Sequence, residues 1–390
     1  MRRNFDDVPP REGTNSIKYD LRKEIFGSPG IIPMWVADMD FKTPDFIMSA
    51  VRKRMEHEIL GYTFRPETYF SSIIKWLETR HAWKTEKEWI CFSPGIVPAL
   101  NFATLAFTSP GDGIIVQPPV YHPFFPAVNS HDRQLVYNNL EGRNGRWEMD
   151  FDSLRECAAT KPGMLMLSNP HNPVGRAWEP DELARMAEIC LENNIIILSD
   201  EIHSDLVMPG YRHTPVASLS PEVAAITVTC IAPSKTFNLA GLSTSSVIIS
   251  NPELRKKFTS VTENLHITGG NIFGNEASVA AYTYGHEWLE DLLAYLNSNA
   301  LFLKEFCSKN IPSVIPATLE ATYLQWLDCR RLGMTGKELH DFFVFKAAVG
   351  MNEGSTFGAG GEGFMRMNIA CSRQTLVKAL EQIGQAVNSL

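Results

Sequence analysis

The sequence predicts an α/β fold, with a largely parallel sheet in one large domain and a smaller α+β lobe after it. Three observations predict this fold. Between residues 89 and 250, short apolar runs alternate with stretches of helical periodicity, as in βαβ units. The runs are apolar throughout rather than alternating, so both faces of each strand should be covered. From about residue 287 the order changes to a long helix, two strands and a closing helix.

The expected elements follow one another in a clear order. Residues 1–45 contain many Pro and Gly residues and predict an irregular arm. Amphipathic helices are expected over 45–60, 67–83, 95–108 and 180–194. Strands are expected at 89–92, 113–119, 163–170, 194–201, 224–231 and 245–250. The last part predicts a helix over 287–310, strands over 321–328 and 364–371, and a helix over 372–390.

This order predicts three segments: 1–45 as an arm with part of the small domain, 46–286 as the large domain, and 287–390 as the C-terminal small domain. A chain of 390 residues is long enough for this division. No internal repeat interrupts it.

Composition excludes several functional classes. The net charge is −8 and no basic stretch occurs, which argues against nucleic acid or an anionic membrane as the main partner. The seven cysteines are scattered without a CxxC pair, so neither a disulfide framework nor a zinc site is expected. Reduced thiols, no secretory signal and no apolar run of about 20 residues predict a cytoplasmic protein outside the membrane.

Polar and aromatic residues follow the predicted strands, where ligands bind in open α/β sheets. Gly95, Ile96 and Val97 open a helix, and their backbone N–H groups could bind a phosphate or could simply begin an ordinary helix. Tyr121 lies between prolines in "PPVYHPF", and its ring could stack on a flat ligand or belong to the core.

Later strand ends carry amide, acid and amine groups. Two Asn-Pro pairs in "SNPHNPVG" mark a turn that presents Asn169 and Asn172. Asp200 follows an apolar run, and a buried carboxylate there needs a cationic partner or backbone N–H groups. Lys235 in "APSKTF" lies beside Ser234 between two buried runs. Read alone, Lys235 fits a surface loop; burial would instead make its amine a nucleophile.

Taken together, these groups suit a planar, phosphorylated pyridine aldehyde. The lysine would form a Schiff base, and the acid would hold the pyridinium proton so that the ring acts as an electron sink. The order along the chain is phosphate-suited helix start, aromatic ring, Asn, Asp and Lys, each after a successive strand. "GAGGEG" at 358–363 matches GxGxxG but precedes a predicted strand, so we interpret it as a flexible loop near Arg366.

The chain resembles the fold-type-I pyridoxal-phosphate enzymes of the class I/II aminotransferase superfamily, and within them the PatB/MalY group of C–S β-lyases. The resemblance rests on motifs between residues 33 and 371: "PMWVADMDF", "GYT", "QPPVYHPF", "NPHNPVGR", "SDEIHSDL", "APSKTFNLAGL" and "GGEGFMRMNIACS". It implies a large domain with a mostly parallel seven-stranded sheet, a smaller α+β domain and pyridoxal 5′-phosphate as cofactor.

The resemblance also implies roles for single residues. The catalytic residues would be Lys235, Tyr121 and Asp200: Lys235 would be the Schiff-base lysine and general base, Tyr121 would stack on the ring, and Asp200 would hold the pyridine nitrogen. The rest of the cofactor would contact Gly95, Ile96, Val97, Ser234, Tyr121, Asn172 and His203. Tyr62 in "GYTF" would reach the phosphate of a neighbouring subunit, which implies a homodimer with shared sites. The amino-acid substrate would contact Arg366, Val36, Ala37 and Asn172.

The implied reaction is α,β-elimination from cystathionine or another S-substituted L-cysteine, giving a thiol, pyruvate and ammonia. Transamination on the same cofactor remains an alternative, because it uses the same lysine, aspartate and arginine. Ser243 stands where many aminotransferases have a phosphate-binding arginine, which makes transamination the less natural interpretation. A regulatory role through protein binding, as in some relatives, is a second alternative.

Overall fold

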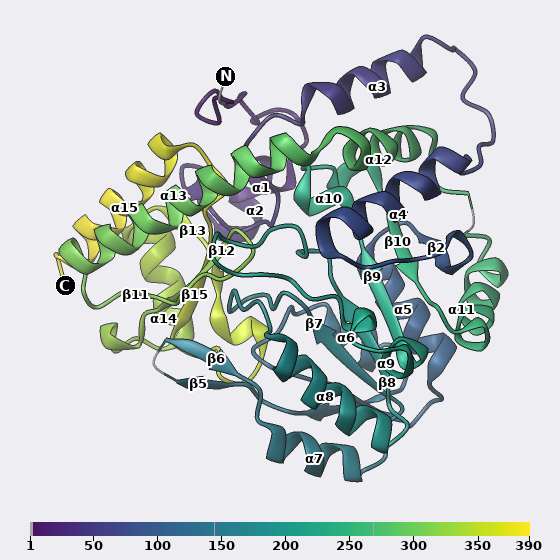
Figure 1. Ribbon diagram of the computed structural model, residues 1–390. Helices are drawn as coiled ribbons and strands as arrows, with labels where there is room; N and C mark the ends of the chain where they lie inside the picture. Colours follow the sequence, from purple (N-terminus) through teal and green to yellow (C-terminus); the bar gives the residue numbers. More distant parts are fainter. Residues whose placement is uncertain (1–2, 144, 268) are drawn as a thin grey trace.

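The computed structural model describes residues 3–143, 145–267 and 269–390, and a seven-stranded sheet lies at its centre (Figure 1). The strand order is β2-β10-β9-β8-β7-β3-β4. Five adjacent strands, β9 to β4 in that order, pair in parallel, and only β10 runs against both of its neighbours. The predicted α/β class and mostly parallel seven-stranded sheet are confirmed. The strand bounds are β2 Ile90–Ser93, β3 Gly113–Val116, β4 Gln134–Tyr137, β7 Met164–Ser168, β8 Ile196–Asp200, β9 Thr227–Ile231 and β10 Ser245–Ile248.

Helices cover both faces of this sheet, which explains why its strands are apolar throughout. In β7, Leu165 and Leu167 pack with α7 (Phe151–Ala159), α8 (Pro180–Glu192) and α9 (Pro221–Ile226). Met164 and Met166 point to the other face, where α5 (Ile96–Phe107), α6 (Phe124–Asn129) and α11 (Pro252–Asn264) lie. Alternation of side chains along a strand distributes its residues between the two cores.

A second, four-stranded sheet lies toward the C-terminal end, in the order β11-β12-β15-β14 (Figure 1). Its strands are β11 Ile315–Pro316, β12 Leu324–Asp328, β14 Asn352–Glu353 and β15 Phe364–Asn368. Helices α13 (His286–Asn310), α14 (Gly336–Asp341) and α15 (Arg373–Val387) accompany it. The N-terminal arm joins this region, because β1 (Ile32–Pro33) pairs in parallel with β13 (Val349–Gly350). A short hairpin, β5 (Glu141–Arg143) with β6 (Arg146–Glu148), completes the strands.

Several boundaries differ from the expected ones. The first long helix, α3 (Asp45–Met55), ends before residue 60, and residues 57–66 lead without helix to α4 (Glu67–His81). The run at 224–231 is only partly strand, because α9 extends to Ile226. The arm, which the sequence predicts to be irregular, contains two short helices, α1 (Ile17–Asp20) and α2 (Arg22–Phe26). Two further helices, α11 and α12 (Ile272–Tyr284), are not among the predicted elements. Within the described residues, no helix is long and apolar enough to cross a bilayer.

Candidate active site

A cavity of about 250 Å³ lies where β8 ends and α5 begins. Because β2 and the parallel strands point the same way, the groups that follow them meet at one edge of the sheet. Most of the predicted site residues line this cavity: Ala37, Gly95, Ile96, Val97, Tyr121, Asn172, Asp200, His203, Ser234 and Lys235. The structure therefore brings together groups that are almost 200 residues apart in the sequence.

Lys235 lies in α10 (Pro233–Thr236), the single turn that follows β9. Its Nζ donates a hydrogen bond of 2.5 Å to the carbonyl oxygen of Ala37. Burial lowers the pKa of Lys235 to about 8, and the charge of Arg366 acts in the same direction. A larger share of the amine is therefore unprotonated near neutral pH than in an exposed lysine, as a nucleophile or base requires.

Asp200 is the last residue of β8 and is 4% exposed. Its Oδ1 accepts a hydrogen bond of 3.1 Å from the backbone N–H of Ile202. Burial raises the pKa of Asp200 to about 7, although Lys235 acts in the opposite direction. A buried carboxylate with so raised a pKa would gain most from a cationic group placed in the cavity.

The N-terminus of α5 faces the same cavity. Gly95 is its N-cap and has no side chain to cap the first backbone N–H groups, which belong to Ile96 and Val97. The helix has 12 residues, so its N-terminal dipole and free N–H groups favour an anion. Ser243 and Thr244 line the cavity as well. Ser243 adopts a left-handed φ of 45°.

Arg366 belongs to β15 in the second sheet, yet it contacts the cavity wall. Its Nη1 donates to Oδ1 of Asn172 across 2.9 Å, and its Nη2 donates to Oδ1 of Asn352 across 2.7 Å. Arg366 is 3% exposed, and its Nε is buried without a partner among the described residues. Burial lowers the pKa of Arg366 to about 10. A buried guanidinium without a carboxylate bonded to it is suited to receive one from a ligand.

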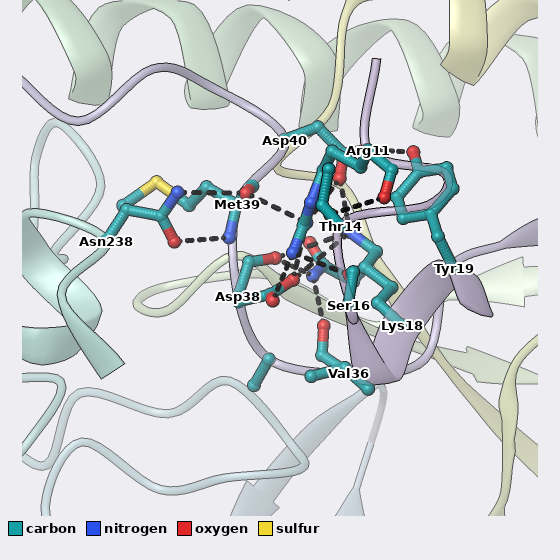
Figure 2. Close-up of polar contacts among 12 residues, drawn as sticks. Arg11, Thr14, Ser16, Lys18, Tyr19, Val36, Asp38, Met39, Asp40 and Asn238 are labelled. Atoms are coloured by element: carbon teal, nitrogen blue, oxygen red, sulfur yellow. Dashed lines mark hydrogen bonds and ion pairs between the residues drawn. The ribbon is translucent and has the colours of Figure 1, made fainter. Parts of the chain in front are cut away.

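Residues 36–41, here called the strap, place the Ala37 carbonyl opposite Lys235. Asn238, three residues after Lys235, holds the strap by accepting from Met39 N (3.0 Å) and donating to Met39 O (2.9 Å) (Figure 2). From the other side, Nδ2 of Asn368 donates to the carbonyl oxygen of Val36 across 2.6 Å. The predicted substrate residue Val36 thus lies in the strap, but only Ala37 of the pair lines the cavity.

Charged residues of the N-terminal arm fix the strap further. Arg11 forms a bidentate pair with Asp38, with N–O distances of 2.6 and 2.9 Å (Figure 2). Lys18 is 1% exposed, and its Nζ lies 3.0 Å from Oδ1 of Asp40. Buried charges are tolerated only when paired in this way. The arm, which the sequence predicts only as irregular, therefore supports the site from behind.

His203 lines the cavity, and Tyr323 contacts both His203 and Ala37 of its lining. Burial, Lys235 and Arg366 lower the pKa of His203 to about 3, so this ring is neutral, and its Nδ1 is buried without a partner among the described residues. The hydroxyl of Tyr323 donates to the Ala37 carbonyl across 3.0 Å, and its ring meets His203 edge to face. Tyr323 and Thr244 lie in no motif that marks them as site residues, whereas Ser168 begins the "SNPHNPVG" turn without being predicted as one.

Tyr62 lies elsewhere. It is fully exposed in the segment between α3 and α4 and does not line the cavity of its own chain. Its neighbours Ile59, Leu60 and Phe64 are also exposed. The prediction that Tyr62 reaches a neighbouring subunit is not tested by a single chain.

The chain is similar to several known proteins in sequence and structure. The family model described as aminotransferase class I and II matches residues 30–383. Cystathionine beta-lyase PatB of Bacillus subtilis (strain 168) is 43% identical over 387 residues, covering 99% of this chain and 100% of the relative. Cystalysin from Treponema denticola, whose crystal structure contains a pyridoxal 5′-phosphate cofactor, superimposes with a TM-score of 0.97 at 36% identity over 100% of both chains. The pyridoxal-phosphate-bound C–S lyase from Staphylococcus hominis superimposes with a TM-score of 0.92 at 32% identity, covering 99% of this chain and 98% of that chain.

The family model spans most of the chain, and the B. subtilis relative is aligned over nearly its whole length. The sequence motifs, the seven-stranded sheet and the cavity at its edge agree with this match. The chain therefore belongs to the aminotransferase class I and II family.

Proposed function

We propose that this protein is a pyridoxal-phosphate-dependent C–S β-lyase acting on cystathionine or another S-substituted L-cysteine. The observation that carries the proposal is the presence of a partly buried lysine, Lys235, and a buried aspartate, Asp200, in one cavity beside a helix N-terminus. The full-length similarity to a cystathionine beta-lyase and to two lyase structures that contain the cofactor supports the choice of reaction.

The donor set of the cavity fits pyridoxal phosphate. Asp200 has a raised pKa because it is buried, and a protonated ring nitrogen would supply the missing cation. The uncapped N–H groups at the start of α5, with Ser234, would hold the phosphate. Tyr121 offers its ring for stacking, while Asn172 and His203 offer hydrogen bonds at the ring hydroxyl. Lys235 supplies the amine that would bind the aldehyde.

When bound, pyridoxal phosphate supplies an aldehyde for the substrate amine and a ring that withdraws electrons from Cα. Arg366 holds the α-carboxylate through its planar guanidinium and so orients the substrate. Once the substrate amine has replaced Lys235 at the aldehyde, the freed Nζ would take the proton from Cα, and the Ala37 carbonyl would keep that amine in place. Loss of the proton expels the thiolate from Cβ, and hydrolysis of the remaining fragment gives pyruvate and ammonia.

The proposal includes a homodimer in the cytoplasm. Exposed apolar side chains at the end of α3 and in the segment between α3 and α4, namely Met55, Ile59, Leu60, Tyr62 and Phe64, suit burial against a second copy of this chain. Tyr62 would then complete the partner's phosphate site. The seven cysteines are all buried and unpaired, as suits a reducing compartment.

The test is an absorbance spectrum of the purified protein with added pyridoxal phosphate, recorded beside Lys235→Ala. We expect a band in the visible region that disappears in the variant. No band in the unaltered protein would refute the cofactor and the enzymatic role together. A second assay, with an S-substituted L-cysteine and no keto acid, should release thiol and pyruvate in equal amounts. Turnover that requires a keto acid would instead establish transamination.

A further inference from the structure

The turn that carries Lys235 is too short to hold its own direction. Helix α10 has four residues, and one isolated helical turn is unstable by itself. Tertiary contacts must therefore fix where Nζ points. One of them comes from the next residue, Thr236, which is fully buried and whose hydroxyl donates to Oδ2 of Asp205 across 2.9 Å.

Asp205 is itself held rigidly. Its other oxygen, Oδ1, lies 3.0 Å from Nε1 of Trp76 and 2.9 Å from Nε2 of His81, both on α4. Asp205 is 4% exposed. Burial raises its pKa, but the hydrogen bonds from His81 and Trp76 and the charges of His81 and Arg80 together outweigh burial, so the pKa of Asp205 lies below its ordinary value. The carboxylate stays charged and accepts three hydrogen bonds, an arrangement that allows little movement.

A second carboxylate–histidine pair lies next to Asp200 in the chain. Glu201 follows it in the chain, and its Oε2 lies 2.9 Å from Nε2 of His213. Its Oε1 accepts from Ser199 Oγ at 2.8 Å and from Val216 N at 3.1 Å. The rings of His81 and His213 meet edge to face with centroids 5.2 Å apart. Two carboxylate–histidine pairs thus connect the turn of Lys235 with the strand of Asp200.

We propose that Asp205 is a positioning residue for Lys235, acting through the Thr236 hydroxyl. Neither Asp205 nor Thr236 lines the cavity, so neither would touch the cofactor or the substrate. The proposal rests on the proposed function, in which Lys235 removes the α-proton. Proton transfer depends steeply on donor–acceptor geometry, and a displacement of about 1 Å can cost roughly 100-fold in rate. Loss of the hydrogen bond between Thr236 and Asp205 should therefore slow removal of the α-proton without weakening substrate binding.

The test uses Thr236→Val, which removes the hydroxyl but keeps the shape of the side chain. Asp205 then retains Trp76 and His81, so the fold is not put at risk as it would be by replacing Asp205. Thr236→Ser restores the hydroxyl. Thr227→Val is the matched control, because Thr227 is a buried threonine at the start of β9 whose hydroxyl donates to a backbone carbonyl.

The readout is exchange of the α-hydrogen of L-alanine with D₂O, followed by NMR on the cofactor-loaded enzyme. This substrate has no leaving group, so the measurement reports removal and return of the α-proton without the elimination step. Thr236→Val should slow exchange by roughly tenfold to a hundredfold, the size expected for a lost hydrogen bond to a charged group. The concentration of alanine at half-maximal rate should stay within about twofold. Thr236→Ser should recover most of the rate, and Thr227→Val should lose little.

The outcomes separate the two proposals. If the unaltered enzyme exchanges the α-hydrogen and Thr236→Val does so equally fast, the positioning role of Asp205 is refuted while the cofactor chemistry stands. If Thr227→Val is slowed as much as Thr236→Val, the effect reflects general loosening, and the positioning role is again refuted. If the unaltered protein shows neither exchange nor a visible band, the proposed function fails, and the positioning role with it.

Discussion

Nη1 of Arg366 donates to Oδ1 of Asn172 across 2.9 Å, and this contact joins two sheets. Arg366 comes from β15 of the four-stranded sheet, whereas Asn172 lies in the turn after β7 of the seven-stranded sheet. The arginine that we assign to the substrate carboxylate is therefore held by a residue that we assign to the cofactor. Its second nitrogen, Nη2, is fixed by Asn352 at 2.7 Å.

Replacing the guanidinium of Arg366 should impair substrate binding. In Arg366→Lys the positive charge remains, but a lysine cannot bind a carboxylate bidentately or keep both amide contacts. We expect KM for an S-substituted cysteine to rise roughly tenfold to 150-fold, corresponding to about 1.5–3 kcal/mol for hydrogen bonds to a charged group. The visible band should persist. Arg155→Lys, at a half-exposed arginine with a loose ion pair, is the control. An unchanged KM would rule out Arg366 as the carboxylate site.

The raised pKa of Asp200 predicts how the stability of the cofactor-free protein changes with pH. Its pKa rises from 3.8 to about 7 on folding because it is buried. Between those values the folded protein binds more protons than the unfolded chain, so the free energy of unfolding contributed by Asp200 falls as pH rises. This contribution is fully present below about pH 4 and is lost as the pH passes about 7.

Urea unfolding from pH 4 to pH 8 tests this expectation. Asp200→Asn cannot titrate, so its free energy of unfolding should fall less steeply with pH than that of the unaltered protein. Added pyridoxal phosphate should flatten the same slope, because a ring cation beside Asp200 would lower its pKa again. Exposed Asp7 offers the control substitution, Asp7→Asn. Equal slopes for Asp200→Asn and the unaltered protein would contradict a raised pKa at this position.

The central sheet could be predicted from the sequence because its strands are apolar on both faces. Met164 to Ser168 is an example: five consecutive buried residues between Gly and an Asn-Pro turn. Groups directly after such strands, including Asp200 and Lys235, could be predicted as site residues for the same reason. Their chemical roles, and the division of the chain at residues 46 and 287, stay predictions.

Other features depend on tertiary contacts that no local pattern announces. Tyr323 reaches the Ala37 carbonyl across nearly 290 positions of sequence, and Lys18 is buried where it pairs with Asp38 and Asp40. In the loop at 358–363, which the sequence predicts to be flexible, the backbone of Gly361 approaches Gly354 closely. A Cβ on Gly354 would lie 2.0 Å from the carbonyl oxygen of Gly361. Close backbone approach of this kind leaves no periodic signal in the sequence.

The close contact between the backbones of Gly354 and Gly361 makes Gly354 sensitive to substitution. Gly354→Ala would force the backbone at Gly361 to move, and overpacking of this kind costs about 1–3 kcal/mol, sometimes more. The free energy of unfolding in urea should fall by at least that amount. Because β14 (Asn352–Glu353) precedes Gly354 and pairs with Arg366 and Met365, KM should rise as well. Gly30→Ala is the control, since a Cβ there meets nothing within 4 Å. Equal stability of the two variants would refute the close contact between Gly354 and Gly361.

The exposed segment around Tyr62 allows a test of shared active sites. If Tyr62 completes the partner's phosphate site, Tyr62→Ala and Lys235→Ala homodimers should both be poorly active. A mixed dimer would contain one site with both residues and one with neither. Refolding the two variants together in equal amounts should give half mixed dimers by random pairing, and hence about a quarter of the unaltered activity. Tyr284→Ala, which removes another exposed tyrosine, should be active without mixing.

Recovery of activity on mixing requires that each site take Lys235 from one subunit and Tyr62 from the other. If Tyr62 acted within its own chain, no mixed dimer would contain an intact site with a working lysine, and mixing would restore nothing. Full activity of the Tyr62→Ala homodimer would exclude any role for this side chain. Sedimentation of the same samples distinguishes loss of the dimer from a failed site, because Tyr62→Ala removes apolar surface that we expect the dimer to bury. A mixture that remains dimeric, exchanges subunits and stays inactive would therefore refute the shared site itself.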